Sequence, residues 1–511
     1  MSRPVPRDRW LADAAGRFAT LAAWRQTHPT ATWGEIEAAI DAQLGPLRAA
    51  LLRDTAMASE ATDLGGRRPA CPQCGEPLQA AGVRPRRLRS EHDVAITVTR
   101  TSARCPACGA GLFPLDEELG LLPGALTPPL QAHLSRLGGR LSFAEAAREL
   151  GQLKGVTVSA ASARRRTEAD GRRYAALEAA RAAALLAEPA PPPPGPAVQQ
   201  VSVDGAMVPL ADGRWREART LAIGTVRPGR GPGTTRCAEV SYFSRMVDAT
   251  AFALAATGEV HRRGVETAGV VAGVVDGADW CQAFLDTHRP DAVRILDFPH
   301  AAQRLGEVAE AVWGAGPAAR AWAATQRAEL RDGDPGPVVA AIRGLPVAAA
   351  AAPEAARQCQ AETLGYLEPR LEQMRYAAFR RQGLPIGSGL VESANKVVVE
   401  ARLKGAGRRW AEANVDALLA LRGAICSERW DEAWAAIAGA RRRQSRRARS
   451  AAAPAPVASA ASVAAPRRRR THPAVPQVPL PGPKRIVNGR PTAAHPWKRF
   501  AGSPEPPPAK L

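Results

Sequence analysis

Four acidic residues directly follow apolar or glycine-rich runs. A charged residue next to a segment that is expected to be buried calls for an explanation. The four residues are Asp204 in 201-VSVDG-205, Asp276 in 269-GVVAGVVDG-277, Asp297 in 294-RILDFPH-300 and Glu392 in 387-GSGLVESANK-396. Each has an ordinary explanation by itself, because Asp-Gly is common in turns and an aspartate can cap a helix. The shared context is more informative, since the apolar runs are typical of neighbouring strands. Carboxylates gathered at strand ends are the ligands that Mg²⁺ prefers.

This arrangement predicts two-metal chemistry on an RNase H-like α/β core. In that fold a central strand and its neighbour bring two aspartates together, and an acid from a later helix completes the cluster. The cluster holds two Mg²⁺ (or Mn²⁺) ions about 3.5–4 Å apart, which activate the attacking oxygen and stabilise the leaving oxygen of a phosphodiester. We predict Asp204 as the first acid and Glu392 as the last, with Glu400 as a weaker alternative to Glu392.

Two Cys-Pro-x-Cys-Gly motifs predict a second, different metal site. They are 71-CPQCG-75 and 105-CPACG-109, which contain Cys71, Cys74, Cys105 and Cys108. Paired Cys-x-x-Cys motifs supply the four thiolates of a closed, structural Zn²⁺ site. Iron–sulfur binding or a redox pair is the alternative. The strand-like run 94-VAITVTR-100 between the motifs is typical of a zinc ribbon.

The positive charge is concentrated at the end of the chain. Residues 441–511 contain sixteen Lys and Arg against one acid, Glu505, in a chain of formal charge +20. A Pro/Ala/Arg-rich segment without apolar periodicity is expected to be disordered and to attract nucleic acid without sequence preference. A solubilising tail is the alternative. The sequence shows neither a membrane-spanning run nor a secretory signal, so we expect a soluble, cytoplasmic, nucleoid-associated protein without membrane partners.

Changes of composition predict the domain boundaries. We expect an N-terminal helical region at 1–67, a zinc ribbon at 68–112, a helical, helix-turn-helix-like DNA-binding region at 113–186, a Pro-rich linker at 187–197, a catalytic domain at 198–440 with a helical insertion at about 301–380, and the basic tail at 441–511. The DNA-binding interpretation of 113–186 depends on a basic helix with Arg164, Arg165 and Arg166. Generic helix packing explains that pattern equally well.

Local patterns also predict individual elements. The sequences 32-TWGE-35 and 142-SFAE-145 have the form of capping boxes that begin helices. Strand-like apolar runs occur at VQQVSVD, RTLAIGTV, EVSYFSRMV, AGVVAGVVD and AVRILDF.

Several longer stretches resemble ISKra-type transposases of bacterial insertion sequences, within the Mutator-like DDE group. The resemblance covers most of the chain, including TWGEIE, both cysteine motifs and NGRPTAAHPWKRF. It is carried by 203-VDGAMVPL-210, 272-AGVVDGADW-280, 295-ILDFPHAAQRL-305 and, most distinctively, 383-GLPIGSGLVESANKVVVEARLKGAGRRW-410. It implies an RNase H-like fold and a DNA transposase, which cleaves at the ends of the insertion sequence and transfers the freed 3′-hydroxyl to target DNA.

The resemblance also bears on the second acid, for which Asp276 and Asp297 both qualify. Asp276 stands in the VxDG context of the group's second acid. The run from Asp297 to His300 matches its downstream Cys/Asp-x-x-His element. We therefore predict Asp276 as the metal ligand, while Asp297 and His300 orient DNA or the scissile phosphate. A purely structural His300 is the alternative.

The basic segment after Glu392 is expected to contact DNA. The predicted contacts in this segment are Lys396, Arg402, Lys404, Arg408, Arg409 and Trp410, whose indole would stack on a splayed base. Lys396 and Glu400 follow Glu392 at intervals of four, which predicts one shared helix face. A solvated face with a core tryptophan is the alternative.

The predicted partner is double-stranded DNA, both element ends and target, and joining two ends predicts a homo-oligomer. Two other functions use the same features. A DNA-binding protein that has lost catalysis would keep the cysteine motifs and the basic tail. A structure-selective nuclease or RNA-processing enzyme would use the same acids. Inverted repeats flanking the gene would favour transposition over both.

Overall fold

The computed structural model describes residues 4–64, 68–231, 234–451, 486–487 and 490–491. Residues Met1–Ala455 form one compact unit and Pro456–Leu511 a second. In the second unit, β9 (Ile486–Val487) pairs antiparallel with β10 (Arg490–Pro491). The remainder of the predicted basic tail after Ala451 lies outside the described residues.

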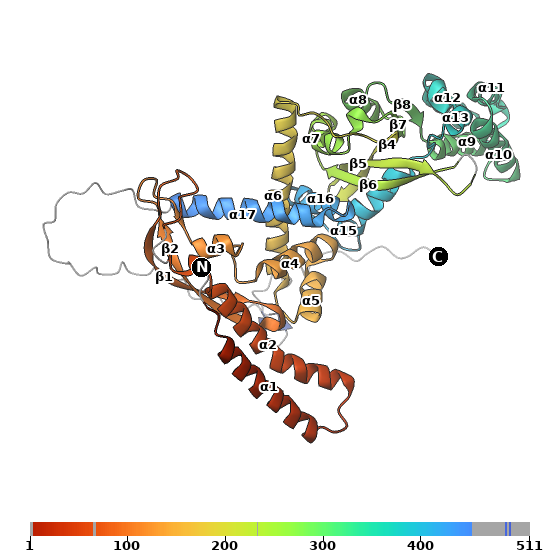
Figure 1. Ribbon diagram of the computed structural model, residues 1–511. Helices are drawn as coiled ribbons and strands as arrows, with labels where there is room; N and C mark the ends of the chain where they lie inside the picture. Colours follow the sequence, from red (N-terminus) through yellow and green to blue (C-terminus); the bar gives the residue numbers. More distant parts are fainter. Residues whose placement is uncertain (1–3, 65–67, 232–233, 452–485, 488–489, 492–511) are drawn as a thin grey trace. The chain divides into compact units, whose positions relative to one another are not determined.

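The chain begins with two long helices, α1 (Arg7–Thr27) and α2 (Trp33–Met57), shown in red in Figure 1. The capping box expected from 32-TWGE-35 starts α2. The Thr32 side chain accepts a hydrogen bond from the Glu35 backbone N–H, and the Glu35 carboxylate accepts one from the Thr32 backbone N–H. Two of the orphan donors at the helix start are thereby satisfied.

The cysteine motifs lie in the turns beside a three-stranded antiparallel sheet, one before β1 (Gln79–Arg89) and one between β2 (Ala95–Arg104) and β3 (Gly111–Leu112). The alternation in 94-VAITVTR-100 correctly predicted β2, whose Ile96 and Val98 are buried. The sequence did not predict β1, because its run of arginines lies exposed and has no apolar alternation.

Helices α3 (Pro114–Glu118), α4 (Pro128–Arg140), α5 (Phe143–Lys154) and α6 (Ala160–Ala187) follow. The predicted second capping box, between Ser142 and Glu145, begins α5. Helix α6 is 28 residues long and packs against α16 (Glu412–Cys426). Helices α5 and α6 follow each other as the predicted helix-turn-helix requires, but DNA binding by this pair stays a prediction.

The centre of the molecule is a mixed five-stranded sheet in the order β6-β5-β4-β7-β8, and the fold class is α/β. The strands are β4 (Val198–Pro209), β5 (Trp215–Pro228), β6 (Thr235–Arg245), β7 (Val270–Val275) and β8 (Val293–Leu296). The first three pair antiparallel, and β4, β7 and β8 run parallel. The apolar runs of the sequence predicted all five strands, because buried strands favour β-branched residues.

The two faces of the sheet are covered by different helices (Figure 1). Val201 and Val203 of β4 pack with Phe252 and Phe284, which belong to α7 (Ala249–Arg262) and α8 (Asp279–His288). The residues of β4 that point to the opposite face, such as Val208, pack with α16 and with the helical residues Val398 and Leu403. Because side chains alternate along a strand, Asp204 belongs to the second face.

The predicted helical insertion is present between β8 and residue 381. It consists of α9 (Phe298–Trp313), α10 (Pro317–Asp332), α11 (Pro335–Arg343), α12 (Pro353–Leu367), the 3₁₀ segment η5 (Glu368–Met374) and α13 (Tyr376–Arg381). Its apolar side chains form one core with Ile295 and Leu296 of β8.

Helix α17 (Trp430–Ala451) overturns the predicted start of the tail at residue 441. Arg441 is 3% exposed and donates hydrogen bonds to the Pro123 carbonyl (2.7 Å) and the Gln131 side chain (2.6 Å). The basic composition of this segment suggested a solvated tail, but its helix packs on residues more than 300 positions earlier.

The Pro-rich run is bound to the α/β region along its path. The Thr267 hydroxyl donates to the Pro193 carbonyl (2.6 Å) and accepts from the Gly195 backbone N–H (2.8 Å). Residues on both sides of this run thus belong to the same compact unit. In the described part of the chain, the helices are too short or too polar to cross a bilayer.

Candidate active site and metal centre

The three predicted aspartates lie on one line across β4, β7 and β8. Val201 pairs with Gly273, and Val275 pairs with Leu296. Continuing these registers past the last paired residues relates Asp204 to Asp276 and Asp276 to Asp297. Asp204 itself lies within β4, which continues five residues further against β5. The expectation that Asp204 ends its strand was therefore wrong, since only the parallel neighbour ends there.

The Asp204 carboxylate is half-buried between β4 and the helix that carries Glu392. Oδ1 accepts a hydrogen bond from the Gly205 backbone N–H (2.7 Å), and Oδ2 accepts one from Asn395 Nδ2 (2.8 Å). Burial raises the pKa of Asp204, and the negative charge of Asp276 raises it further. The two aspartates are therefore close enough to repel each other, which a bound cation would offset.

Asp276 follows β7 and is held by the first turn after the strand. Its Oδ1 accepts a hydrogen bond from the Ala278 backbone N–H (3.0 Å) and lies 3.4 Å from the thiol of Cys281. Cys281 is buried, and its Sγ also lies 3.7 Å from the Val203 carbonyl of β4. The thiol thus connects the strand of Asp204 with the carboxylate of Asp276.

Asp297 differs from the other two aspartates because it is fully buried. Oδ1 accepts the Ser388 backbone N–H (2.6 Å), and Oδ2 pairs with His300 Nδ1 (2.5 Å). This hydrogen bond raises the pKa of His300, and the charges of Asp297, Asp276 and Asp204 act in the same direction. Asp297 therefore connects β8, the histidine and the loop that leads to Glu392.

Glu392 lies on α14 (Gly389–Ala394), which continues as a π-helix, η6 (Asn395–Glu400), and then as α15 (Ala401–Leu403). The half-buried Glu392 accepts a hydrogen bond of 3.4 Å from the Ser388 hydroxyl. The face predicted to be shared by Glu392, Lys396 and Glu400 runs from α14 into this π turn and stays a prediction. Glu400 pairs with Lys404 (2.6 Å).

The acids do not form a closed cluster by themselves. Within the described ranges, the four cysteines are the only group of three or more His, Cys, Asp or Glu side chains whose ligand atoms all lie within 4.8 Å of one another. The charges of Asp204 and Asp276 interact, and Asn395 of the helix that carries Glu392 is hydrogen-bonded to Asp204.

A cavity of about 400 Å³ opens beside Asp276 and His300. Helical-insertion residues contribute the far wall: Arg304 and Arg370 place their guanidinium groups 5.2 and 4.9 Å from the ring centroid of Tyr366. The Tyr366 hydroxyl donates to the Asp276 carbonyl, and Arg370 donates to the Gly277 carbonyl (2.8 Å). The sequence did not indicate these residues, because no local pattern connects positions some 90 residues apart.

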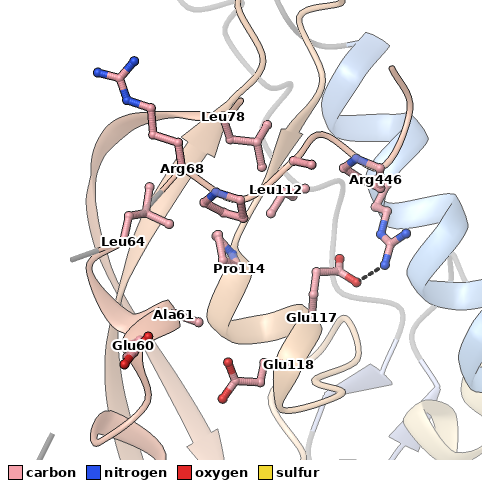
Figure 2. Close-up of a pocket in the computed structure, with 13 residues that line it drawn as sticks. Glu60, Ala61, Leu64, Arg68, Leu78, Leu112, Pro114, Glu117, Glu118 and Arg446 are labelled. Atoms are coloured by element: carbon pink, nitrogen blue, oxygen red, sulfur yellow. Dashed lines mark hydrogen bonds and ion pairs between the residues drawn. The ribbon is translucent and has the colours of Figure 1, made fainter. Parts of the chain in front are cut away.

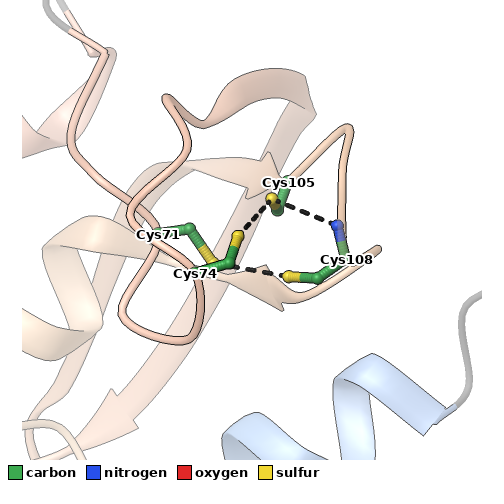
Figure 3. Close-up of side chains that lie close together, drawn as sticks. All are labelled: Cys71, Cys74, Cys105 and Cys108. Atoms are coloured by element: carbon green, nitrogen blue, oxygen red, sulfur yellow. Dashed lines mark hydrogen bonds between the residues drawn. The ribbon is translucent and has the colours of Figure 1, made fainter.

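The four predicted zinc ligands do meet in space (Figure 3). Cys71 Sγ lies 3.6 Å from Cys108 Sγ, and Cys74 Sγ lies 3.5 Å from Cys105 Sγ. Four thiolates at Zn–S distances of about 2.3 Å in tetrahedral geometry would lie roughly 3.8 Å apart. The donor set and its spacing therefore fit a metal such as zinc.

Each knuckle has the glycine that its turn requires. Gly75 and Gly109 have φ values of 79° and 70°, a conformation that side-chain-bearing residues rarely adopt. Their backbone N–H groups close the turns on the carbonyls of Cys71 (2.9 Å) and Cys105 (3.1 Å). The glycine after each Cys-x-x-Cys is thus explained by local geometry.

A cavity of about 650 Å³ lies next to the cysteine-bearing sheet (Figure 2). Leu78 and Leu112 line it from the sheet, Pro114 from α3, and Arg446 from α17, where it is hydrogen-bonded to Glu117. The sequence did not predict this cavity, because its lining comes from segments that meet only in the folded chain.

The predicted DNA contacts fall into two groups. Arg164, Arg165, Lys396 and Arg409 are exposed, whereas Arg166, Lys404 and Arg408 are half-buried and hydrogen-bonded within the protein. Arg402 and Trp410 are buried, and this part of the prediction was wrong. The Arg402 guanidinium lies 4.7 Å from the Phe143 ring and 4.8 Å from the Trp410 ring, and it donates to the Gly138 carbonyl (3.1 Å).

Comparison with known proteins adds no assignment, because no family model and no curated protein sequence matches this chain.

Proposed function

We propose that this protein is a DNA transposase with an RNase H-like catalytic domain. The observation that carries the proposal is that the parallel register of β4 and β7, continued past Val201 and Gly273, brings Asp204 of β4 beside Asp276, which directly follows β7. Asn395 of the Glu392 helix is hydrogen-bonded to Asp204. This is the arrangement that the resemblance to ISKra-type transposases implies. A central strand, its neighbour and a later helix each contribute one acid.

The donor set suits divalent cations that prefer oxygen. Asp204, Asp276 and Glu392 would hold Mg²⁺ or Mn²⁺, which activates the attacking oxygen and stabilises the leaving oxygen of a phosphodiester. Asp204 and Asp276 repel each other before the ion binds, and this repulsion favours binding. Asn395 and Gly205 orient the Asp204 carboxylate, and Cys281 and Ala278 orient that of Asp276.

Asp297 acts in this proposal as a positioning residue. Its fully buried carboxylate accepts the Ser388 backbone N–H and pairs with His300, and so it holds the histidine beside the acids. The raised pKa of His300 favours its protonated form, and a protonated imidazole beside the acids can attract the scissile phosphate. Arg304 and Arg370 provide further positive charge in the cavity beside Asp276.

Cleavage of a plasmid that carries the gene's native flanks, with Mg²⁺ or Mn²⁺, tests the proposal. We expect metal-dependent breaks at the flanks, reduced at least about 10²-fold in Asp204→Asn, Asp276→Asn and Glu392→Gln. Asp286→Asn is the matched control, because this exposed carboxylate on α8 pairs with Arg294 outside the site. Asp297→Asn should retain weak activity.

Three results would change the assignment. Activity in Asp276→Asn together with complete loss in Asp297→Asn would exchange the second acid. Cleavage that is independent of the flanks would indicate a structure-selective nuclease. Specific binding of the flanks by folded wild-type protein without cleavage would indicate a DNA-binding protein that has lost catalysis.

A further inference from the structure

A cavity of about 640 Å³ between α6 and α17 is lined by four arginines. They are Arg165, Arg166, Arg173 and Arg441. The other lining residues are uncharged, and they include Pro123 and Gly124 from the segment before α4. This cavity shares no lining residue with the cavity beside Asp276.

Arg441 is the most buried of these arginines and is only partly satisfied. Its Nη2 donates to Pro123 and Gln131, but its Nη1 has no hydrogen-bond acceptor among the described residues. The nearest carboxylate oxygen, Oδ2 of Asp170, lies 3.7 Å from Nη1. A buried guanidinium with a donor group left unpaired in a cavity is a binding feature for an anion.

The charges around the cavity are not balanced. Asp170 is the buried carboxylate nearest to Arg441, and it also accepts the Ser135 hydroxyl (2.8 Å) and pairs with Arg173 Nη1 (3.3 Å). Burial lowers the pKa of Arg441 to about 10, and the positive charges of Arg166 and Arg173 act in the same direction despite Asp170. Arg166, Arg173 and Arg441 therefore share one internal carboxylate, Arg165 adds a fourth positive charge, and an external anion would complete the set.

We propose that this cavity is a phosphate-binding site, in which Arg441 and Arg165 hold a phosphate group of the backbone of double-stranded DNA. Planar guanidinium groups match phosphate oxygens in pairs. Exposed arginines continue outside the cavity on both helices, at Arg164 of α6 and Arg443 of α17. A duplex presents phosphates at regular intervals, so it can contact the cavity and these arginines together. The choice of DNA as the source of the phosphate rests on the proposed function.

Binding of a fluorescent DNA duplex at several salt concentrations tests this site. We would use the full chain loaded with zinc and carrying Asp204→Asn, without Mg²⁺, so that cleavage plays no part. Arg165→Gln and Arg441→Gln should each lower the slope of log Kd against log salt, by up to about 0.9 if the shared phosphate contact is lost completely. Arg320→Gln, at an exposed position of α10 outside the cavity, loses the same charge and should leave the slope unchanged.

Inorganic phosphate alone provides the second measurement, read as a shift in Tm. If it stabilises the protein through Arg441 while no DNA slope changes, the site takes a free phosphate compound, and DNA is excluded as its source. If neither the slope nor the phosphate shift depends on Arg165 or Arg441, the proposal is overturned. Arg165 is exposed, so Arg165→Gln is expected to fold. The test therefore remains decisive even if Arg441→Gln does not fold. Loss of transposase activity alone leaves these outcomes unaffected.

Discussion

The hydrogen bond between Asp297 and His300 shows how a buried carboxylate can control an exposed group. Asp297 is fully buried, while the His300 side chain is 43% exposed and faces the acids. The bond fixes the imidazole through Nδ1 and leaves Nε2 for a ligand. At the scale of single residues, the site thus combines carboxylates for metal ions with a histidine whose charge depends on pH.

The pH dependence of His300 is a direct prediction of this arrangement. Because its folded pKa is raised above the ordinary value of about 6.5, protonation favours the folded state. Its contribution to stability is complete below pH about 6.5 and is lost as pH rises through the folded pKa. NMR titration of the imidazole should give a lower pKa in Asp297→Asn than in wild type. An identical titration in both proteins would mean that Asp297 does not control His300.

At the scale of elements, the cysteine-bearing sheet has only a small apolar core beside its four cysteines. Strand β1 is mostly exposed, and the buried core around Cys71 and Cys105 contains only a few apolar residues, such as Leu78 and Leu112. Such a core is too small to stabilise a sheet alone, and structural zinc usually supplies the missing free energy.

We therefore expect one zinc ion per chain, and its removal should open this sheet. Cys74→Ser should reduce the zinc content and accelerate amide hydrogen exchange in β1 and β2. Cys359→Ser is the matched control, because this half-buried cysteine lies on α12 in the helical insertion. Elemental analysis and hydrogen exchange provide the two measurements. A zinc-free wild-type protein with protected β1 and β2 amides would contradict the assignment.

At the scale of the whole compact unit, the helices before the Pro-rich run are packed on elements that follow it. Helix α6 contacts α16 so closely that a Cβ on Gly171 would lie 2.2 Å from the Ala417 carbonyl oxygen. Arg402 is similarly enclosed by Phe143 and bonded to Gly138. The helical region before the run and the Glu392 helix are therefore coupled through direct contacts.

Two Gly→Ala substitutions distinguish the effect of the α6–α16 contact on stability from the general effect of helix propensity. Gly171→Ala should lower the free energy of unfolding by about 1–3 kcal/mol, because the added methyl group clashes with a helix backbone. Gly151→Ala, on α5, has open space around the added methyl group and should raise stability by about 0.5–1 kcal/mol. Denaturant unfolding of both variants measures the difference. Equal effects would mean that α6 and α16 can separate at little cost.

The local features of this protein follow from its sequence alone. Apolar β-branched runs predicted the five central strands, and both capping boxes and both cysteine knuckles form as their spacing indicates. These features depend on residues a few positions apart, whose backbone preferences and side-chain reach are readable in the chain. The approximate positions of Asp204 and Asp276 could also be predicted from the sequence, because each is set by the strand next to it in the chain.

Other features depended on packing between distant segments. The sequence predicted that Arg402 and Trp410 face DNA and that a tail begins at Arg441, yet all three side chains are buried. The full burial of Asp297 likewise depends on a tertiary contact, because it accepts the backbone N–H of Ser388, which lies 91 positions later in the chain. Whether an arginine is exposed to solvent or buried depends on the hydrogen-bond acceptors and aromatic rings that tertiary contacts place beside it. Only the folded structure decides which partners those are.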